Sequence, residues 1–276
     1  MPRFIQIFTL LIFFVYSFHS VGVGSGESCY RNLRAISKKG LLPMPTDPVA
    51  SLREKHWTVS KAPEGLQSEG VVKNLEQAFN RIFTEYGNQP SAARVLIGGL
   101  KGYKPRDTEN IATVNEATAR VIDQWANETL ELAKKATGED LVIVNVSMAR
   151  GHRVGNDEGT LIHADTGGTY LHALVTLKGP TTVAFPSNSE LGNHRLISVD
   201  SKTGEMKVRK IDRKSEVQPA VFTIETGGQT LPGETLVFGG ADYAVAKPGR
   251  VAIQHASPPT SDLNRLTLFI SLEPRK

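Results

Sequence analysis

The chain of 276 residues contains a single cysteine, Cys29, and this scarcity excludes two kinds of stabilising site. One cysteine cannot form an intramolecular disulfide, and it cannot supply the thiolate cluster of a cysteine-based zinc site. Hydrophobic residues make up 39% of the sequence and charged residues 22%, which is typical of a globular protein with a sizeable core. We therefore expect the stability of the fold to come from that core.

A strong charge of one sign is also absent. The sequence has 32 basic and 28 acidic residues, and the net charge of +4 is spread along the chain rather than gathered in a tail. Such a small excess does not imply a nucleic-acid partner. The glycine-rich, basic stretch Gly98–Lys104 lacks the lysine followed by serine or threonine that completes a phosphate-binding loop, so we interpret it as a connector.

No apolar run is long enough for a comfortable membrane span. The apolar block from Phe4 to Tyr16 is shorter than the roughly 20 residues that a spanning helix needs. Arg3 precedes this block and the small residues Val21–Gly26 follow it, an order typical of a secretory signal peptide. We therefore predict a signal peptide over residues 1–26 and a secreted or periplasmic protein, with an uncleaved membrane anchor as the alternative.

The hydrophobic pattern divides the remainder of the chain at Gly138. Before it, apolar residues recur with helical spacing over Val71–Tyr86 and again from about Asn110 to Thr137, which predicts two amphipathic helices. After it, short apolar runs are broken by glycine and proline, a pattern typical of strands. We expect an α+β protein with a helical lead-in over residues 27–138, packed on an all-β sandwich or jelly roll over residues 139–276.

Two histidines and one aspartate on strand-like segments form the candidate metal site. His163 and Asp165 are two residues apart, so in an extended segment both side chains point the same way and can reach one ion. His255, on a later strand-like segment, is the candidate third ligand. Two imidazoles and one carboxylate leave coordination positions open, an arrangement typical of non-haem Fe(II) oxygenases.

Arg265 is the candidate partner of an organic acid bound at that metal. It opens the apolar, strand-like run Leu266–Leu272, a short distance after His255. A guanidinium presents a planar fork that binds a carboxylate through two parallel hydrogen bonds. The far carboxylate of a metal-bound diacid would therefore pair with Arg265.

The order His-x-Asp, a long interval, His and then Arg resembles that of the Fe(II)/2-oxoglutarate-dependent dioxygenases, whose fold is a double-stranded β-helix of the cupin-like jelly-roll class. The resemblance runs from roughly residue 141 to the C-terminus. It implies that His163, Asp165 and His255 hold Fe(II). Arg265 would then bind the C5 carboxylate of 2-oxoglutarate. The implied reaction is oxidative decarboxylation of 2-oxoglutarate to succinate, usually with hydroxylation of a bound substrate.

Two further residues are candidates for a hydrogen bond to the cosubstrate from their positions alone, Tyr170 and Lys178. The substrate itself is expected to be a small molecule or a peptide. Neither its identity nor a recognition motif for it follows from the sequence.

A closer likeness is to the bacterial family called domain of unknown function eighteen-twenty-six. Its core also has His-x-Asp, an apolar strand, a Gly-Pro turn and a later His-x-Ser-Pro-Pro, which here are His163–Asp165, Leu171–Leu177, Gly179–Thr182 and His255–Pro259. This likeness supports the fold and the metal site and implies no substrate. It does not cover the first half of the chain.

Several alternatives stay open at this stage. His172 lies on an apolar strand-like run, where we interpret it as a core histidine and, alternatively, as an extra metal ligand. The β unit is alternatively a cupin that holds zinc or manganese, with Arg265 in direct contact with an anionic ligand. A third interpretation is a jelly-roll binding protein without catalysis.

Overall fold

The computed structural model describes residues 41–85, 94–101, 103, 111–150, 165, 170–179, 181–186, 195–199, 206–210, 221–222, 228–256 and 265–275. The predicted signal peptide over residues 1–26 lies outside them, and so does His163.

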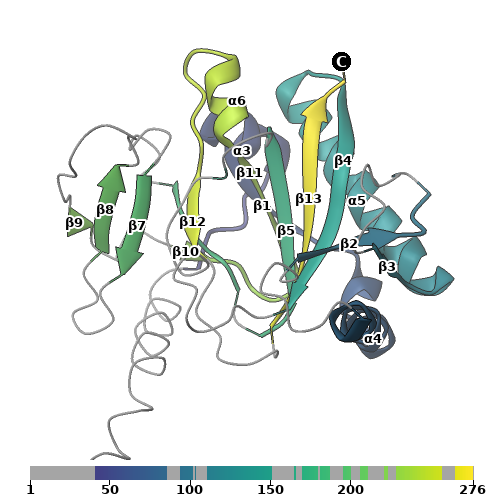
Figure 1. Ribbon diagram of the computed structural model, residues 1–276. Helices are drawn as coiled ribbons and strands as arrows, with labels where there is room; N and C mark the ends of the chain where they lie inside the picture. Colours follow the sequence, from purple (N-terminus) through teal and green to yellow (C-terminus); the bar gives the residue numbers. More distant parts are fainter. Residues whose placement is uncertain are drawn as a thin grey trace, which may run out of the picture.

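Seven strands form the large sheet, in the order β1-β11-β5-β13-β4-β2-β3. Neighbouring strands are antiparallel except β2 and β3, which are parallel. Figure 1 shows the long strands β4, β13 and β5 side by side at the centre of this sheet. The strand bounds are β1 Trp57–Lys61, β2 Arg94–Gly98, β3 Ile111–Thr113, β4 Leu141–Arg150, β5 Leu171–Lys178, β11 Glu234–Gly239 and β13 Leu266–Pro274.

Two smaller sheets have three strands each, ordered β10-β6-β12 and β7-β8-β9. From β5 onward the chain crosses between the large sheet and the first small sheet: β6, β10 and β12 lie in the small sheet, while β11 and β13 return to the large one. This alternation agrees with a jelly-roll-like path. The bounds are β6 Val183–Phe185, β7 Arg195–Val199, β8 Met206–Lys210, β9 Val221–Phe222, β10 Gly228–Gln229 and β12 Gln254–Ala256.

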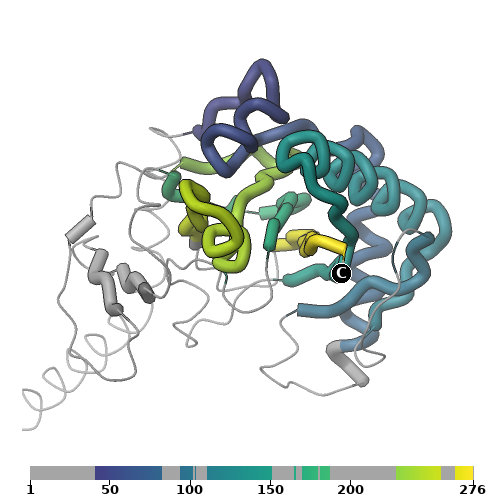
Figure 2. The backbone as a smooth tube through the Cα atoms, turned by 90° about the horizontal axis from the view of Figure 1, so that it is seen from above, coloured from purple at the N-terminus to yellow at the C-terminus, as the bar shows by residue number. Residues whose placement is uncertain are grey.

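Helices cover one face of the large sheet. They are α3 Pro48–Lys55, α4 Glu69–Glu85 and α5 Glu116–Thr137, with the short 3-10 helix η1 Glu64–Gln67 between the first two. Figure 2 shows α3 and α5 along the same side of the sheet, and Arg53 of α3 joins them by donating to the carbonyl oxygens of Lys135 and Ala136. A fourth helix, α6 Ala241–Ala246, lies between β11 and β12.

The boundaries of α5 follow from its capping residues. Asn115 accepts a hydrogen bond from the amide of Thr118 at 2.8 Å, which satisfies one of the free N–H groups of the first turn. Gly138 adopts a φ of 70°, a left-handed conformation that glycine tolerates best, and ends the helix. Trp125 is buried on the face between these caps, and its indole N–H donates to Thr235 Oγ1 of β11 at 2.8 Å.

The alternation of side chains along each strand gives the large sheet two different faces. The core cluster shared with the helices includes four alternating residues of β13: Leu266, Leu268, Ile270 and Leu272. On the opposite face, Leu174, Leu236 and Phe238 pack with Ala184 and Ile253, which belong to the small sheet or directly precede it. The face of the large sheet that meets the small sheet is called the inner face below.

The helical lead-in predicted for residues 27–138 also contains three strands, which the hydrophobic pattern did not predict. Residues of β1, β2 and β3 precede Gly138 and nevertheless lengthen the large sheet. Residues 111–113 belong to β3, so the helix predicted from about Asn110 begins at Glu116. In the second half, α6 interrupts a unit that the pattern predicted to be free of helices. Short apolar segments have no clear period, so their pairing partners decide between helix and strand.

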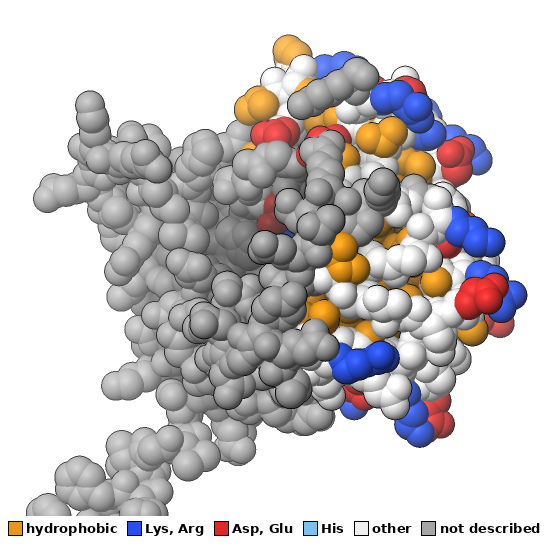
Figure 3. Space-filling view, turned by 45° about the vertical axis from the view of Figure 1, so that its right-hand side comes forward, with side chains coloured by type: hydrophobic (Ala, Val, Ile, Leu, Met, Phe, Trp, Pro, Cys, Tyr) orange, Lys and Arg blue, Asp and Glu red, His pale blue; other side chains and the backbone are white. Residues whose placement is uncertain are grey.

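One face of the described surface has no strong charge of one sign (Figure 3), and the described helices are not of the membrane-spanning kind. Basic and acidic side chains are intermixed over the described part of the face in Figure 3. Among the helices in the described ranges, none combines the length and apolar character needed to cross a membrane.

Candidate functional site

Asp165 and His255 come together at the inner face. The backbone carbonyl of Asp165 accepts a hydrogen bond from the amide of Ala241 at 3.0 Å, which ties this residue to the start of α6. His255 lies opposite Ala184 in the pairing of β12 with β6 and is buried. Its Nε2 atom is 3.7 Å from Oδ2 of Asp165. The structure thus brings together two predicted ligands that are 90 positions apart in the sequence.

The separation of these two atoms suits a shared ion. Nitrogen and oxygen ligands lie about 2.0 to 2.2 Å from a small divalent metal, so two of them are about 3 Å apart at a right angle and about 4.4 Å apart at most. The 3.7 Å between Asp165 and His255 is within this range. One carboxylate and one imidazole are also the donor types of the non-haem iron site. The described residues therefore fit two of its three ligands.

His172 also contacts Asp165. Its Nδ1 atom contacts Oδ2 of Asp165, and its Nε2 atom is 2.8 Å from Oγ of Ser271 on the paired strand β13. Both ring nitrogens are therefore engaged by protein groups. Of the two interpretations of His172, this favours the structural one, and no group of three metal-binding side chains occurs among the described residues.

Arg265 enters the inner face at the start of β13. Only 1% of its surface is exposed, and Nη2 donates to Oγ1 of Thr182 at 2.8 Å. Burial lowers the pKa of Arg265 to about 10, which still leaves the guanidinium charged at neutral pH. Next to it, Oγ1 of Thr176 and Oγ1 of Thr267 are 3.2 Å apart. A charged donor among hydroxyl groups in a dry interior is suited to binding a carboxylate.

A second guanidinium reaches the same face from β2. Arg94 is exposed as a residue, but its charged end packs inward: Nε donates to Oγ of Ser147 at 2.8 Å, and Cζ is 4.4 Å from the ring centre of Phe269. Burial of this end lowers the pKa of Arg94, and the negative charge of Asp165 partly offsets that effect. The inner face therefore carries two guanidinium groups, and the charge of Arg94 interacts with the Asp165 carboxylate.

The structure does not bring Tyr170 and Lys178 to Arg265. Lys178 pairs with Leu266 in the register of β5 and β13, so its side chain lies on the helix-covered face, where Nζ is 2.9 Å from Oε1 of Glu76. Tyr170 belongs to the helix-side core cluster. Their contacts do not support the predicted hydrogen bonds to a cosubstrate, because each side chain faces away from the inner face.

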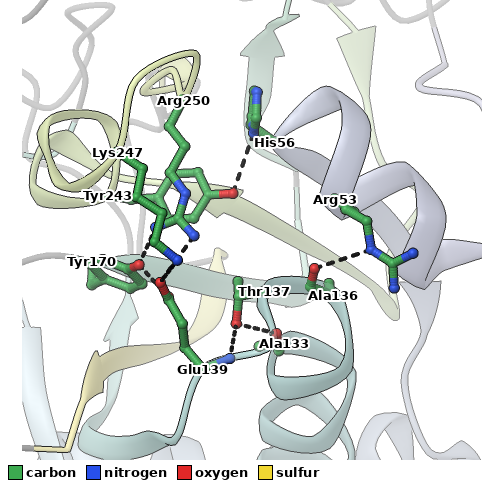
Figure 4. A network of polar contacts seen from close by, with 10 residues as sticks. All are labelled: Arg53, His56, Ala133, Ala136, Thr137, Glu139, Tyr170, Tyr243, Lys247 and Arg250. Carbon is green, nitrogen blue, oxygen red and sulfur yellow. Dashed lines mark hydrogen bonds and ion pairs between the residues drawn. The ribbon is translucent and has the colours of Figure 1, made fainter.

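Tyr170 instead belongs to a polar network at the end of the sheet where β4 and β5 begin (Figure 4). Its hydroxyl contacts Glu139 and Arg250, and burial followed by the hydrogen bond to Glu139 raises the pKa of Tyr170 to about 12. Oε1 of Glu139 is 2.8 Å from Nζ of Lys247 and 3.0 Å from Nη2 of Arg250, whose Cζ is 4.2 Å from the ring centre of Tyr243. These contacts anchor residues 241–250, which join Asp165 to the strand of His255.

We expect Glu139→Gln to destabilise the protein by about 1 to 3 kcal/mol at pH 7, because it removes a charged acceptor from partly buried donors. Burial alone raises the pKa of Glu139, but the hydrogen bonds from Lys247, Tyr170 and Arg250 lower it overall from 4.5. The stabilisation is therefore present above the ordinary pKa and is lost as pH falls through the lowered one. Urea unfolding of both proteins at neutral and acidic pH measures the difference.

The neighbouring Asp140 provides a matched control. Its carboxylate is 3.0 Å from Nε of Arg275, but both side chains are 63% exposed. Exposed ion pairs contribute little, so Asp140→Asn is expected to change stability by less than about 1 kcal/mol. Equal effects of the two substitutions, or a Glu139→Gln effect that persists in acid, would contradict the role assigned to Glu139.

Comparison with known proteins gives matches among solved structures only. No family model and no curated protein matches the chain, so the expected likeness to the domain of unknown function is not supported. A viral collagen prolyl hydroxylase from Paramecium bursaria Chlorella virus-1 matches with 12% identity and a TM-score of 0.45, over 86% of this chain and 98% of that one. HygX from Streptomyces hygroscopicus, with nickel and 2-oxoglutarate bound, matches with 12% identity and a TM-score of 0.43, over 84% and 88%.

A third match is the non-haem alpha-ketoglutarate-dependent epimerase SnoN from nogalamycin biosynthesis, with 14% identity and a TM-score of 0.41, over 82% of this chain and 81% of that one. The matches thus include several non-haem oxygenases of the 2-oxoglutarate-dependent type. At 12% to 14% identity and TM-scores of 0.41 to 0.45, these matches do not by themselves indicate the activity of this chain.

Several residues of the site have no strong signal in the sequence. Thr182 lies in the Gly179–Thr182 turn, but nothing there marks its hydroxyl as a partner of Arg265. Ser271 and Arg94 look like ordinary strand residues. Only the alternation along β13, which puts Arg265 and Ser271 on one face, could have indicated Ser271.

Proposed function

We propose that this protein is an Fe(II)/2-oxoglutarate-dependent oxygenase whose sheets form a double-stranded β-helix. The observation that carries the proposal is the approach of His255 to Asp165 within 3.7 Å on the same inner face that buries Arg265. The proposed metal site and the proposed carboxylate-binding site therefore share the inner face of the large sheet. His163, outside the described residues, is the proposed third ligand.

The proposed roles follow from the chemistry of each group. Asp165, His255 and His163 would hold Fe(II), which supplies dioxygen activation coupled to the conversion of 2-oxoglutarate to succinate. Arg265 would bind and orient the C5 carboxylate through its planar fork. Thr182 holds that guanidinium in place from the neighbouring sheet.

The surroundings of the site are arranged to exclude water. Phe238 lies against His255 with ring centres 4.7 Å apart, and its ring also meets the edge of His172 at 5.9 Å. Leu174 and Ile253 are buried in the same cluster. An apolar surround strengthens the electrostatic interactions of the ligands and of Arg265 with a bound anion.

The test uses purified protein and 2-oxoglutarate. Under anaerobic conditions, addition of Fe(II) and then 2-oxoglutarate is expected to produce the visible charge-transfer absorption of a chelate, and admission of air is expected to release succinate even without the primary substrate. Zinc or manganese in place of iron, with no such absorption, is the matched control. Failure of 2-oxoglutarate to bind the metal-loaded protein would contradict the proposal.

A further inference from the structure

The strongest feature not used by the proposed function is the chain of contacts from Ser271 through His172 to Asp165. His172 is buried near the start of β5, on the inner face, with only 5% of its surface exposed. Its two ring nitrogens meet two different partners, Asp165 at Nδ1 and Ser271 at Nε2. The contact at Nδ1 is made to a proposed metal ligand, whereas the hydrogen bond at Nε2 is made to a residue of the paired strand.

The chemistry of the partners fixes which atoms donate. An ionised carboxylate only accepts hydrogen bonds, so donation from His172 to the Asp165 oxygen that it contacts requires the proton on Nδ1. In a neutral ring Nε2 is then an acceptor, and the hydroxyl of Ser271 donates to it. Ser271 thus selects the tautomer that presents a donor to Asp165.

The orientation of the His172 ring is fixed independently of these bonds. The ring meets Phe238 edge-on, with centres 5.9 Å apart and planes at 88°. In the sheet register His172 lies opposite Phe238 on one side and opposite Ser271 on the other. Both neighbouring strands therefore hold the ring, and the direction of Nδ1 is set before any ligand binds.

We propose that His172 is a positioning residue, which holds the Asp165 carboxylate in the rotation that metal binding requires. This inference rests on the proposed function, since Asp165 is assigned there as a ligand. Without the contact at Nδ1, the carboxylate can rotate about its terminal torsion, and ordering it when the metal binds lowers the metal affinity. Loss of an outer partner of this kind typically lowers metal affinity by about 10- to 100-fold.

Three substitutions of His172 and one of Ser271 separate positioning from packing. His172→Asn places an amide N–H near the position of Nδ1 and keeps a donor to Asp165. His172→Gln extends toward Ser271 and leaves the Nδ1 position without a donor, and His172→Leu fills the space with an apolar side chain. Ser271→Ala removes the group that selects the tautomer.

The measurement is Mn(II) affinity by electron paramagnetic resonance, which requires no turnover. His172→Gln and His172→Leu are expected to bind Mn(II) about 10- to 100-fold more weakly than the parent protein. His172→Asn is expected to remain within about 5-fold of the parent, and Ser271→Ala to lie between the two groups. Circular dichroism and thermal unfolding of each variant establish that it is folded.

A second measurement tests the parent protein directly and does not depend on variant folding. In protein loaded with Zn(II), the nitrogen chemical shifts of His172 are expected to show the proton on Nδ1. A proton on Nε2 alone would overturn the proposal, as would unchanged Mn(II) affinity in His172→Leu or equal losses in the leucine and asparagine variants. Absence of metal binding by the parent protein would instead contradict the proposed function, and the His172 role with it.

Discussion

Asp165→Ala is expected to lower the affinity for Mn(II) or Fe(II) by more than about 100-fold, beyond the effect typical of an outer partner. The carboxylate is the only anionic group assigned to the metal, so its loss removes both a donor atom and the charge that offsets the ion. His255→Ala is expected to have an effect of similar size. The imidazole lies 3.7 Å from Oδ2 of Asp165 and is held by Phe238 and by the β6 pairing.

Equilibrium dialysis against Mn(II) measures these losses, and succinate release reports their consequence for turnover. Asp140→Ala is the matched control, because this carboxylate is exposed and pairs with Arg275 rather than with a residue of the site. His163→Ala belongs in the same series and tests the third ligand. If affinity survived the combined loss of His163, Asp165 and His255, the metal site assigned here would be wrong.

Arg265→Met is expected to weaken 2-oxoglutarate binding by about 10²- to 10⁴-fold while leaving metal affinity nearly unchanged. A bidentate pair makes two charge-assisted hydrogen bonds, each worth about 1.5 to 3 kcal/mol, and each 1.4 kcal/mol changes an affinity tenfold. The guanidinium is already desolvated in the folded protein, as its lowered pKa indicates. Binding of the anion therefore gains the full interaction without a new desolvation cost for the cation.

Titration of 2-oxoglutarate into the Mn(II)-loaded variants by calorimetry measures this effect. Arg265→Lys keeps the charge but loses the fork, so its affinity is expected to lie between those of the parent and the methionine variant. Lys178→Met is the matched control, because its Nζ pairs with Glu76 on the helix-covered face. Equal losses in Arg265→Met and Lys178→Met would contradict the assignment of Arg265 as the cosubstrate-binding residue.

The sequence predicts the elements that have a strong local signal. The apolar spacing of Val72, Leu75, Phe79 and Ile82 identified the helix that the structure shows as α4, and the glycine after Thr137 marked the end of α5. The period-2 pattern after Gly138 likewise identified most of the strands. These predictions succeeded because they depend on neighbours in the chain, within one or two helical turns or along one strand.

The short strands of the first half were missed because their stability comes from distant partners. β1 is five residues long and is held by its antiparallel pairing with β11, from Trp57 opposite Phe238 to Lys61 opposite Glu234. β2 and β3 join the other edge of the sheet in the same way. A segment of three to five residues has no period of its own, so only its place at the sheet edge decides its conformation.

The sequence by itself determined which residues are chemically suited to the site, namely Asp165, His255 and Arg265, because few residue types bind metals or carboxylates. Only the tertiary structure decided how they are arranged. Pairing of β5 with β13 turns Lys178 away and brings Ser271 to His172, and the path through α6 joins Asp165 to the strand that carries His255. Side-chain direction in a sheet depends on register, and a register is a property of two strands rather than of either sequence alone.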